Sequence, residues 1–116
     1  MKEIIAKKLD AKVFSLKGWI NLIDHDELIK FFNTELEIAD FTILNLTQHT
    51  FPYNGFTAVW LLAESHLAIH TFTDSGWTFL ELTSCNKSKS EVFKMNILKS
   101  SYHIKLDRDT IEESEV

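Results

Sequence analysis

The fold of this chain is decided by one stretch, Ala58-Val59-Trp60-Leu61-Leu62-Ala63-Glu64-Ser65-His66-Leu67-Ala68-Ile69-His70-Thr71-Phe72. It begins with an apolar run that is too short to span a membrane and has the length of a buried strand. From residue 66 to residue 72 apolar and polar side chains nearly alternate, which predicts a second strand. Glu64 and Ser65 lie at the junction. Burying them without partners would cost several kcal/mol, so we expect neighbouring groups to hold them.

This polar junction has two interpretations. Polar groups fixed at the end of a core strand are typical of functional sites. The pattern taken alone favours the simpler alternative, a hairpin with a polar tip.

The rest of the chain predicts an α+β fold. Apolar patterns predict strands at residues 13–20, 41–48, 56–63, 66–72, 77–83 and 102–106. The strongest turn signal is Phe51-Pro52-Tyr53-Asn54-Gly55, which contains the only proline. Strands outnumber helices and their connections are short. We therefore predict a two-layer sandwich, a mainly antiparallel sheet covered by two helices on one face.

Two helices are predicted. Asp24 and Glu27 form a capping box, and the helix that follows has an apolar stripe at four-residue spacing, Leu28, Phe32 and Leu36. The second helix, at residues 88–98, is expected to bury Val92, Phe93, Met95 and either Ile97 or Leu98.

Length and charge limit the function classes. The chain has 116 residues, 45% of them hydrophobic, which predicts one domain, 1–116, with a modest core that dimerisation would enlarge. The net charge of −5 argues against a nucleic-acid partner, and −4 of it comes from the acidic tail, residues 107–116, expected to be a solvated end. The first ten residues do not resemble a signal peptide, so we expect a cytoplasmic protein with no membrane partner. The single cysteine cannot form an internal disulfide.

The motif from Glu64 to Phe72 resembles that of the small prokaryotic S-adenosylmethionine decarboxylases, pyruvoyl-dependent enzymes of spermidine biosynthesis. The spacing from Ser65 to Cys85 matches the family without a gap, and Gly76 lies where the family has a glycine. The similarity covers about residues 49–85. Its upstream part comprises the positions of a His-x-Phe motif and of a hydroxyl residue, here His49-Thr50-Phe51 and Thr57.

The resemblance implies a cofactor made from the chain itself. Decarboxylation of an amino acid leaves a carbanion, so a carbonyl must first capture the amine as a Schiff base and then withdraw electrons. In the family, a serine hydroxyl attacks the preceding peptide carbonyl to give an ester, and elimination then leaves a pyruvoyl group. Here the autocatalytic cleavage would fall between Glu64 and Ser65, so that a zymogen gives fragments 1–64 and 65–116. A strained turn at a strand end would suit such an attack.

The resemblance also implies roles for four catalytic residues. Ser65 would become the pyruvoyl group, and His70 would take the α proton during elimination. Thr57 stands where the family has a serine that assists processing. Cys85 would return a proton to the α carbon after carbon dioxide leaves, a role that suits a thiol because its pKa is easily perturbed.

Three further residues would bind the substrate. By the resemblance, Phe51 would stack on the adenine. Glu64 and Asp74 would contact the substrate or its ribose, because a carboxylate can accept hydrogen bonds from both hydroxyls of a diol.

Strand geometry separates two of the catalytic residues. If residues 66–72 form a strand, His70 lies roughly 16 Å along it from Ser65 and on the opposite face. The family resolves this with a dimer whose two active sites lie between protomers, Thr57 and His70 coming from the partner. We therefore predict a two-fold homodimer with shared active sites.

The chain departs from the family at three places. Thr73-Asp74 replaces the usual Pro-Glu, Asn86 replaces the glycine after Cys85, and the strand at residues 13–18 lacks an expected acidic residue. The last change weakens the case for a cationic sulfonium substrate. Two alternatives therefore stay open: a pyruvoyl-dependent arginine or ornithine decarboxylase, and an unprocessed homologue without catalytic activity.

A metal site is not expected. His66 and His70 are four residues apart, a spacing that suits a shared metal on a helix. On a strand they lie roughly 13 Å apart.

Overall fold

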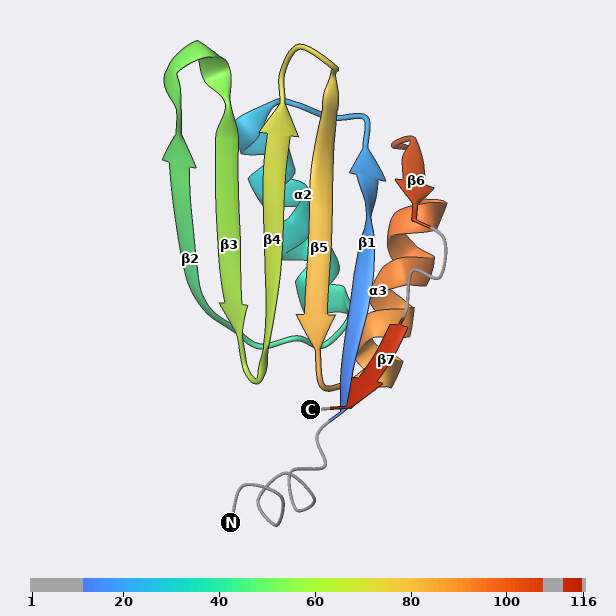
Figure 1. The fold of residues 1–116 in the computed structure, drawn as a ribbon. Helices are drawn as coiled ribbons and strands as arrows, with labels where there is room; N and C mark the ends of the chain where they lie inside the picture. Colours follow the sequence, from blue (N-terminus) through green and yellow to red (C-terminus); the bar gives the residue numbers. More distant parts are fainter. Residues whose placement is uncertain (1–11, 108–111, 116) are drawn as a thin grey trace.

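The central hairpin joins β3 (Phe56–Leu62) to β4 (Ser65–Phe72) through the turn Ala63-Glu64, as the apolar run and the alternation predict. The computed structural model describes residues 12–107 and 112–115 and is shown in Figure 1. The other elements are β1 (Lys12–Ile20), α2 (His25–Ile38), β2 (Ile43–Thr50), the 3-10 helix η1 (Pro52–Asn54), β5 (Trp77–Ser84), α3 (Lys87–Lys99), β6 (Ile104–Leu106) and β7 (Glu112–Glu115).

The strands form one sheet in the order β2-β3-β4-β5-β1-β6, with β7 paired to β1. Every strand pair of the described residues is antiparallel. Figure 1 shows α2 and α3 on the same side, behind the sheet. The predicted α+β two-layer sandwich is therefore confirmed.

Helix α2 forms where its sequence predicts, and one of the two hydrogen bonds of the predicted capping box is present. The Asp24 carboxylate accepts a hydrogen bond of 2.9 Å from the backbone N–H of Glu27, which caps the first turn. Leu28, Phe32 and Leu36 are fully buried against the sheet. The buried indole of Trp60 donates to Asn33 Oδ1 at 2.7 Å, so β3 and α2 are joined by a specific contact as well as by packing.

The two faces of the sheet differ in composition. The face under the helices carries the buried aliphatic and aromatic side chains of the strands, Leu16, Ile20, Phe56, Ala58, Trp60, Leu62, Leu67, Ile69, Leu80 and Leu82. The opposite face, called the open face below, has no helix over it within the described residues (Figure 1). It combines an ion pair of 3.7 Å between Lys17 and Glu81 with partly exposed apolar side chains, Trp19, Val59, Leu61, Phe72 and Phe79.

Three expectations need correction. Helix α3 buries Phe93 and Ile97 together with Ser90, whereas Val92, Met95 and Leu98 are exposed, because its inner side meets α2 and strands β1 and β5 over a narrow strip. Strand β2 begins at Ile43 and has a bulge at Leu44.

The third correction concerns the acidic tail. Residues 112–115, expected to be a solvated end, form β7 and pair with Lys12–Ser15 of β1. Residues 108–111 and 116 of that tail lie outside the described residues, as do residues 1–11.

Within the described part of the chain, no helix combines the length and the apolar character needed to cross a membrane.

Candidate active site

Ser65 follows a residue in a backbone conformation that is rare for its type. Glu64 has φ of +60°, in the left-handed region, which costs a side-chain-bearing residue roughly 1–2 kcal/mol. The turn is tight because Leu62 and Ser65 already pair across the hairpin. The peptide bond between Glu64 and Ser65 therefore leaves a strained position and enters a regular strand, which agrees with the strained turn expected there.

The Ser65 hydroxyl has a buried partner. Ser65 is half-buried and pairs in register with Ser84 at the end of β5. Its Oγ donates a hydrogen bond of 2.8 Å to Ser84 Oγ. Cys85, the residue after Ser84, is exposed and its sulfur is a free thiol. The neighbouring strand thus brings Cys85 to the same end of the sheet as Ser65.

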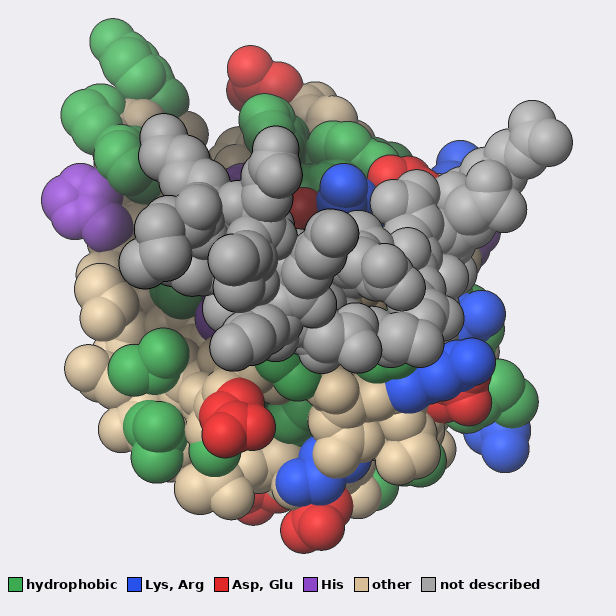
Figure 2. Space-filling model, turned by 60° about the horizontal axis from the view of Figure 1, so that its bottom comes forward, with side chains coloured by type: hydrophobic (Ala, Val, Ile, Leu, Met, Phe, Trp, Pro, Cys, Tyr) green, Lys and Arg blue, Asp and Glu red, His purple; other side chains and the backbone are tan. Residues whose placement is uncertain are grey.

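Two hollows meet at this end, which is called the Ser65 end and comprises Glu64, Ser65, Ser84 and Cys85. The larger, of about 480 Å³, is lined on the open face by Val13, Leu61, His66 and Thr83. The smaller, of about 290 Å³, lies toward α3 and is lined by Phe41, Asn86 and Lys89. Both reach Glu64, Ser65 and Cys85. In Figure 2, which brings this end forward, hydrophobic, acidic and basic side chains of the described residues are interspersed.

Thr57 and His70 form a second group. They face each other across β3 and β4, and Thr57 Oγ1 and His70 Nδ1 share a hydrogen bond of 3.0 Å. His70 is exposed and Thr57 half-buried, both on the open face. His70 is five residues along β4 from Ser65, roughly 16 Å at the rise of a strand. One chain therefore does not bring His70 to Ser65, as the alternation predicts.

Phe51 and Asp74 lie in turns beside this second group. Phe51 is 47% exposed in the β2–β3 connection, where its ring meets His49 edge to face at 4.5 Å between centroids. Asp74 is exposed in the β4–β5 turn, which Gly76 completes with φ of +79°. With Thr57 and His70 they make up the His70 end. Figure 1 shows these two turns at the opposite end of the strands from the β3–β4 turn.

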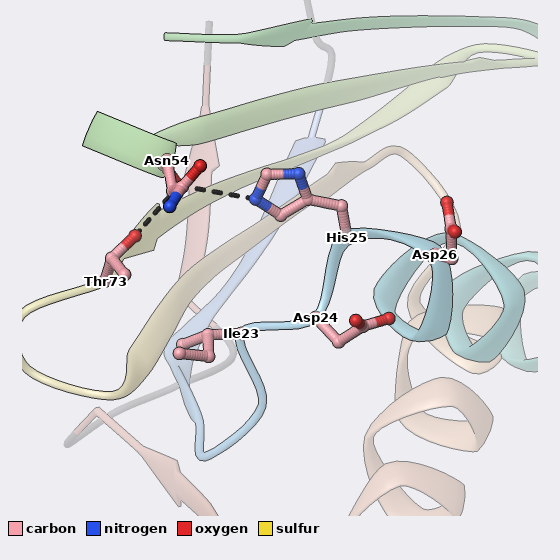
Figure 3. A pocket seen from close by; sticks show the side chains of 6 residues that line it. All are labelled: Ile23, Asp24, His25, Asp26, Asn54 and Thr73. Atoms are coloured by element: carbon pink, nitrogen blue, oxygen red, sulfur yellow. Dashed lines mark hydrogen bonds between the residues drawn. The ribbon is translucent and has the colours of Figure 1, made fainter. Parts of the chain in front are cut away.

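A third hollow, of about 460 Å³, lies where the two turns of the His70 end meet the start of α2. Figure 3 shows the contacts that hold it together: Thr73 Oγ1 donates to the backbone carbonyl of Asn54 at 2.8 Å, and His25 Nε2 lies 3.3 Å from the same oxygen. The His25 ring also stacks on Phe56 at 4.2 Å. These contacts fix both turns against α2, and we assign them a structural role.

Ser84 is not among the site residues predicted from the sequence. Its position was nevertheless visible in the alternation of β5, where Thr78, Leu80, Leu82 and Ser84 all have buried parity. A serine at the last buried position of a core strand must find a hydrogen-bond partner, and Ser65 is that partner.

Away from both ends, one carboxyl group has a shifted pKa. Burial raises the pKa of Glu35, on α2. Its Oε2 is the one buried side-chain oxygen of the described residues without a hydrogen-bond partner. The described residues contain no group of three His, Cys, Asp or Glu side chains arranged to hold a metal ion.

Comparison with known proteins identifies a matching family. The family model of S-adenosylmethionine decarboxylase matches residues 19–106. A proenzyme of that name from Archaeoglobus fulgidus is 31% identical over 112 residues, covering 90% of this chain and 98% of the relative.

Other relatives match over a shorter stretch. The proenzyme from Parasynechococcus marenigrum is 42% identical over 52 residues, covering 45% of this chain but 41% of the relative, so the match spans about two fifths of that protein. Among solved structures, the adenosylmethionine decarboxylase from Aquifex aeolicus superposes with a TM-score of 0.65 at 21% identity, over 92% of this chain and 97% of the other. That likeness shows a common fold.

Proposed function

Because the chain belongs to the S-adenosylmethionine decarboxylase family, we propose that it is a self-cleaving, pyruvoyl-dependent enzyme that decarboxylates S-adenosylmethionine. Its product would be the aminopropyl donor for spermidine biosynthesis, and we expect it to act in the cytoplasm. One observation carries the proposal: Ser65, preceded by a left-handed Glu64, lies where two hollows meet beside Cys85. The relatives are named as proenzymes, which is consistent with a cleaved chain.

The cleavage would use Ser65 on its own peptide bond. Its Oγ would bond to the carbonyl carbon of Glu64 as the bond from that carbon to the Ser65 nitrogen breaks, which gives an ester of unchanged mass. Loss of the Ser65 α proton would then break the bond from the Ser65 side-chain carbon to the ester oxygen, and the Glu64 carboxylate would leave. Water would next replace the Ser65 nitrogen, which is released as ammonia. The strain at Glu64 supports this assignment, since opening the turn relieves it.

The residues of the Ser65 end fit a pyruvoyl group at position 65. That group supplies a carbonyl that accepts the substrate amine and withdraws electrons as carbon dioxide leaves. Cys85, exposed and lining both hollows, would return a proton to the α carbon. Glu64, at the new carboxyl terminus, would contact the substrate from the same hollows.

The His70 end would act on the Ser65 end of a second chain. For His70 to accept the α proton at Nε2, its Nδ1–H has to donate to Thr57 Oγ1, and the hydrogen bond of 3.0 Å between these atoms would hold that tautomer. A two-fold axis through the open face would place each His70 end over the partner's larger hollow. The exposed apolar side chains of the open face favour such a homodimer, which would also supply Phe51 and Asp74 for the adenine and ribose.

Mass spectrometry under denaturing conditions tests the cleavage. We expect two fragments, 1–64 and 65–116, the second lighter by one ammonia than a serine-terminated chain and resistant to amino-terminal sequencing. The Ser65→Ala variant should stay intact and inactive. An intact, inactive wild-type chain would instead favour a non-catalytic homologue.

Release of labelled carbon dioxide then identifies the substrate. S-adenosylmethionine, arginine and ornithine are compared at equal concentrations on the cleaved protein. The first alone should be turned over. Arginine or ornithine remains the alternative because strand β1 carries no acidic side chain at residues 13–18, where a cationic sulfonium would be expected to find one.

A further inference from the structure

We propose that Ser84 is a positioning residue for self-cleavage, one that holds the Ser65 hydroxyl with its lone pairs free to attack the Glu64 carbonyl. This inference rests on the proposed function and concerns its first step, the shift of the Glu64 acyl group from nitrogen to oxygen.

Ser84 is placed for this role by the sheet. It pairs with Ser65 in the β4–β5 register, is 1% exposed, and accepts a hydrogen bond of 2.8 Å from Ser65 Oγ. Because the register of a core strand resists slippage, the distance between the two hydroxyls is set by the fold. Free rotation of the Ser65 side chain is thereby restricted to one orientation.

The connection to α3 determines which serine donates. The backbone N–H of Asn86 donates to Ser84 Oγ at 2.9 Å, and Ser84 Oγ–H in turn points to the Asn86 carbonyl at 3.4 Å. The side-chain oxygen of Asn86 accepts from the backbone N–H of Lys89, which fixes Asn86 as the cap of α3. With its own proton directed to Asn86, Ser84 acts toward Ser65 as an acceptor.

This direction suits the chemistry of the acyl shift. The Ser65 proton is held by Ser84, so the Ser65 lone pairs stay available to form the bond to the Glu64 carbonyl carbon. As that bond forms and the bond from carbon to the Ser65 nitrogen breaks, the hydroxyl proton ends on that nitrogen, and atoms balance without a co-reactant. An alcohol is too weak a base to remove the proton, so Ser84 works by orientation. Losing such orientation costs from a few-fold to about 10²-fold in rate.

A matched control lies in the same cluster. Ser90 is also 1% exposed, and its hydroxyl donates to the same Asn86 carbonyl at 2.8 Å. The described contacts of its hydroxyl do not include Ser65. A purely structural role for Ser84 would therefore make Ser84→Ala and Ser90→Ala behave alike.

The experiment follows cleavage of the full-length chain after synthesis, by denaturing mass spectrometry, with hydroxylamine added to trap the ester. We expect Ser84→Ala to slow both cleavage and ester trapping by about tenfold or more, Ser84→Thr to restore the rate, and Ser90→Ala to stay within about threefold of wild type. Unfolding midpoints are compared in the uncleavable Ser65→Ala background. There Ser84→Ala and Ser90→Ala should lower the midpoint by similar amounts.

Two outcomes would overturn the inference: Ser84→Ala cleaving at the wild-type rate, or Ser90→Ala being slowed as much as Ser84→Ala. A wild-type chain that never cleaves would overturn it together with the proposed function. A wild-type chain that cleaves but releases no carbon dioxide would count against the function alone.

Discussion

The two ends of the β3–β4 hairpin carry similar polar side chains in different settings. At the Ser65 end, a serine emerges from a strained turn, is paired with a buried hydroxyl, and lies between two hollows. At the His70 end, a threonine and a histidine are joined by one hydrogen bond on the open face of the sheet. The first setting suits a residue that reacts in place. The second suits an exposed residue that acts on a group outside its own end of the hairpin.

The separation follows from strand geometry. Five residues of β4 hold the two ends roughly 16 Å apart, and no side-chain rotation closes that gap. If His70 serves Ser65, as proposed, it therefore has to come from a second chain.

The largest effect is expected from co-expression of two inactive variants. Ser65→Ala and His70→Ala should each remain uncleaved when expressed alone. In a mixed dimer, the Ser65 of the His70→Ala chain meets the intact His70 of the Ser65→Ala chain. That site should cleave, whereas the second site lacks both groups. With random pairing about one quarter of all sites should recover, and mass spectrometry should find cleaved fragments of the His70→Ala chain only.

The control co-expresses Ser65→Ala with Ser65→Ala carrying a distinct mass tag, which should yield no fragments. If the mixed sample stays uncleaved while wild type is processed, the shared site is wrong, and His70 acts without a partner or does not act in cleavage.

The next effect separates the two reactions of the Ser65 end. Cys85→Ala should leave cleavage intact, because the acyl shift needs Ser65 and Glu64 but no thiol. Carbon dioxide release should fall by about 10² to 10⁴-fold, the usual contribution of a general acid. Cys85→Ser keeps the shape of the side chain but replaces the thiol by a hydroxyl, a much weaker acid. Its rate of carbon dioxide release should lie between those of wild type and Cys85→Ala. Loss of cleavage in both variants would assign the thiol to processing instead.

The sequence predicts the covered face of the sheet better than its edges. The stripe of α2 and the strands around the central hairpin could be anticipated because each has a strong period and a single burial direction. The inner side of α3 could not, because serine and asparagine interrupt its pattern and the neighbouring elements decide which side chains are covered. Pairing of residues 112–115 with β1 likewise depends on a partner distant in sequence.

The candidate site divides in the same way. One motif and its spacing predict Ser65, His70 and Cys85 as site residues, and the strand pattern predicts that His70 lies far from Ser65, as it does. The partnership of Ser65 with Ser84 required the register of β4 against β5, which a single strand does not specify. The left-handed Glu64 likewise depends on the exact length of the turn.

A smaller effect is expected at the His70 end. Thr57→Val removes the hydroxyl that meets His70 Nδ1 at 3.0 Å but keeps the shape of the side chain. Losing one such hydrogen bond costs about 0.5–1.5 kcal/mol, so cleavage should slow by about 2 to 13-fold. Thr57→Ser should retain most of the rate. A cleavage rate in Thr57→Val equal to that of wild type would leave Thr57 with a packing role only.

The smallest effect is expected from Glu35, which belongs to neither end. Its pKa is raised in the folded protein by burial, so the folded state binds a proton more readily than the unfolded state. Stability therefore falls as the pH rises from the ordinary pKa of glutamate, about 4.3, through the raised value. Glu35→Gln cannot ionise and escapes that loss. Its Tm should match wild type near pH 4 and exceed it slightly at pH 7, by at most about 3 °C.

Cleavage and carbon dioxide release should both stay at wild-type rates in Glu35→Gln, because α2 supplies stability to the sheet while the chemistry depends on the two ends of the hairpin. If a stability change of this size at Glu35 altered cleavage as much as Thr57→Val does, the slower cleavage of the Thr57 variant could no longer be assigned to His70.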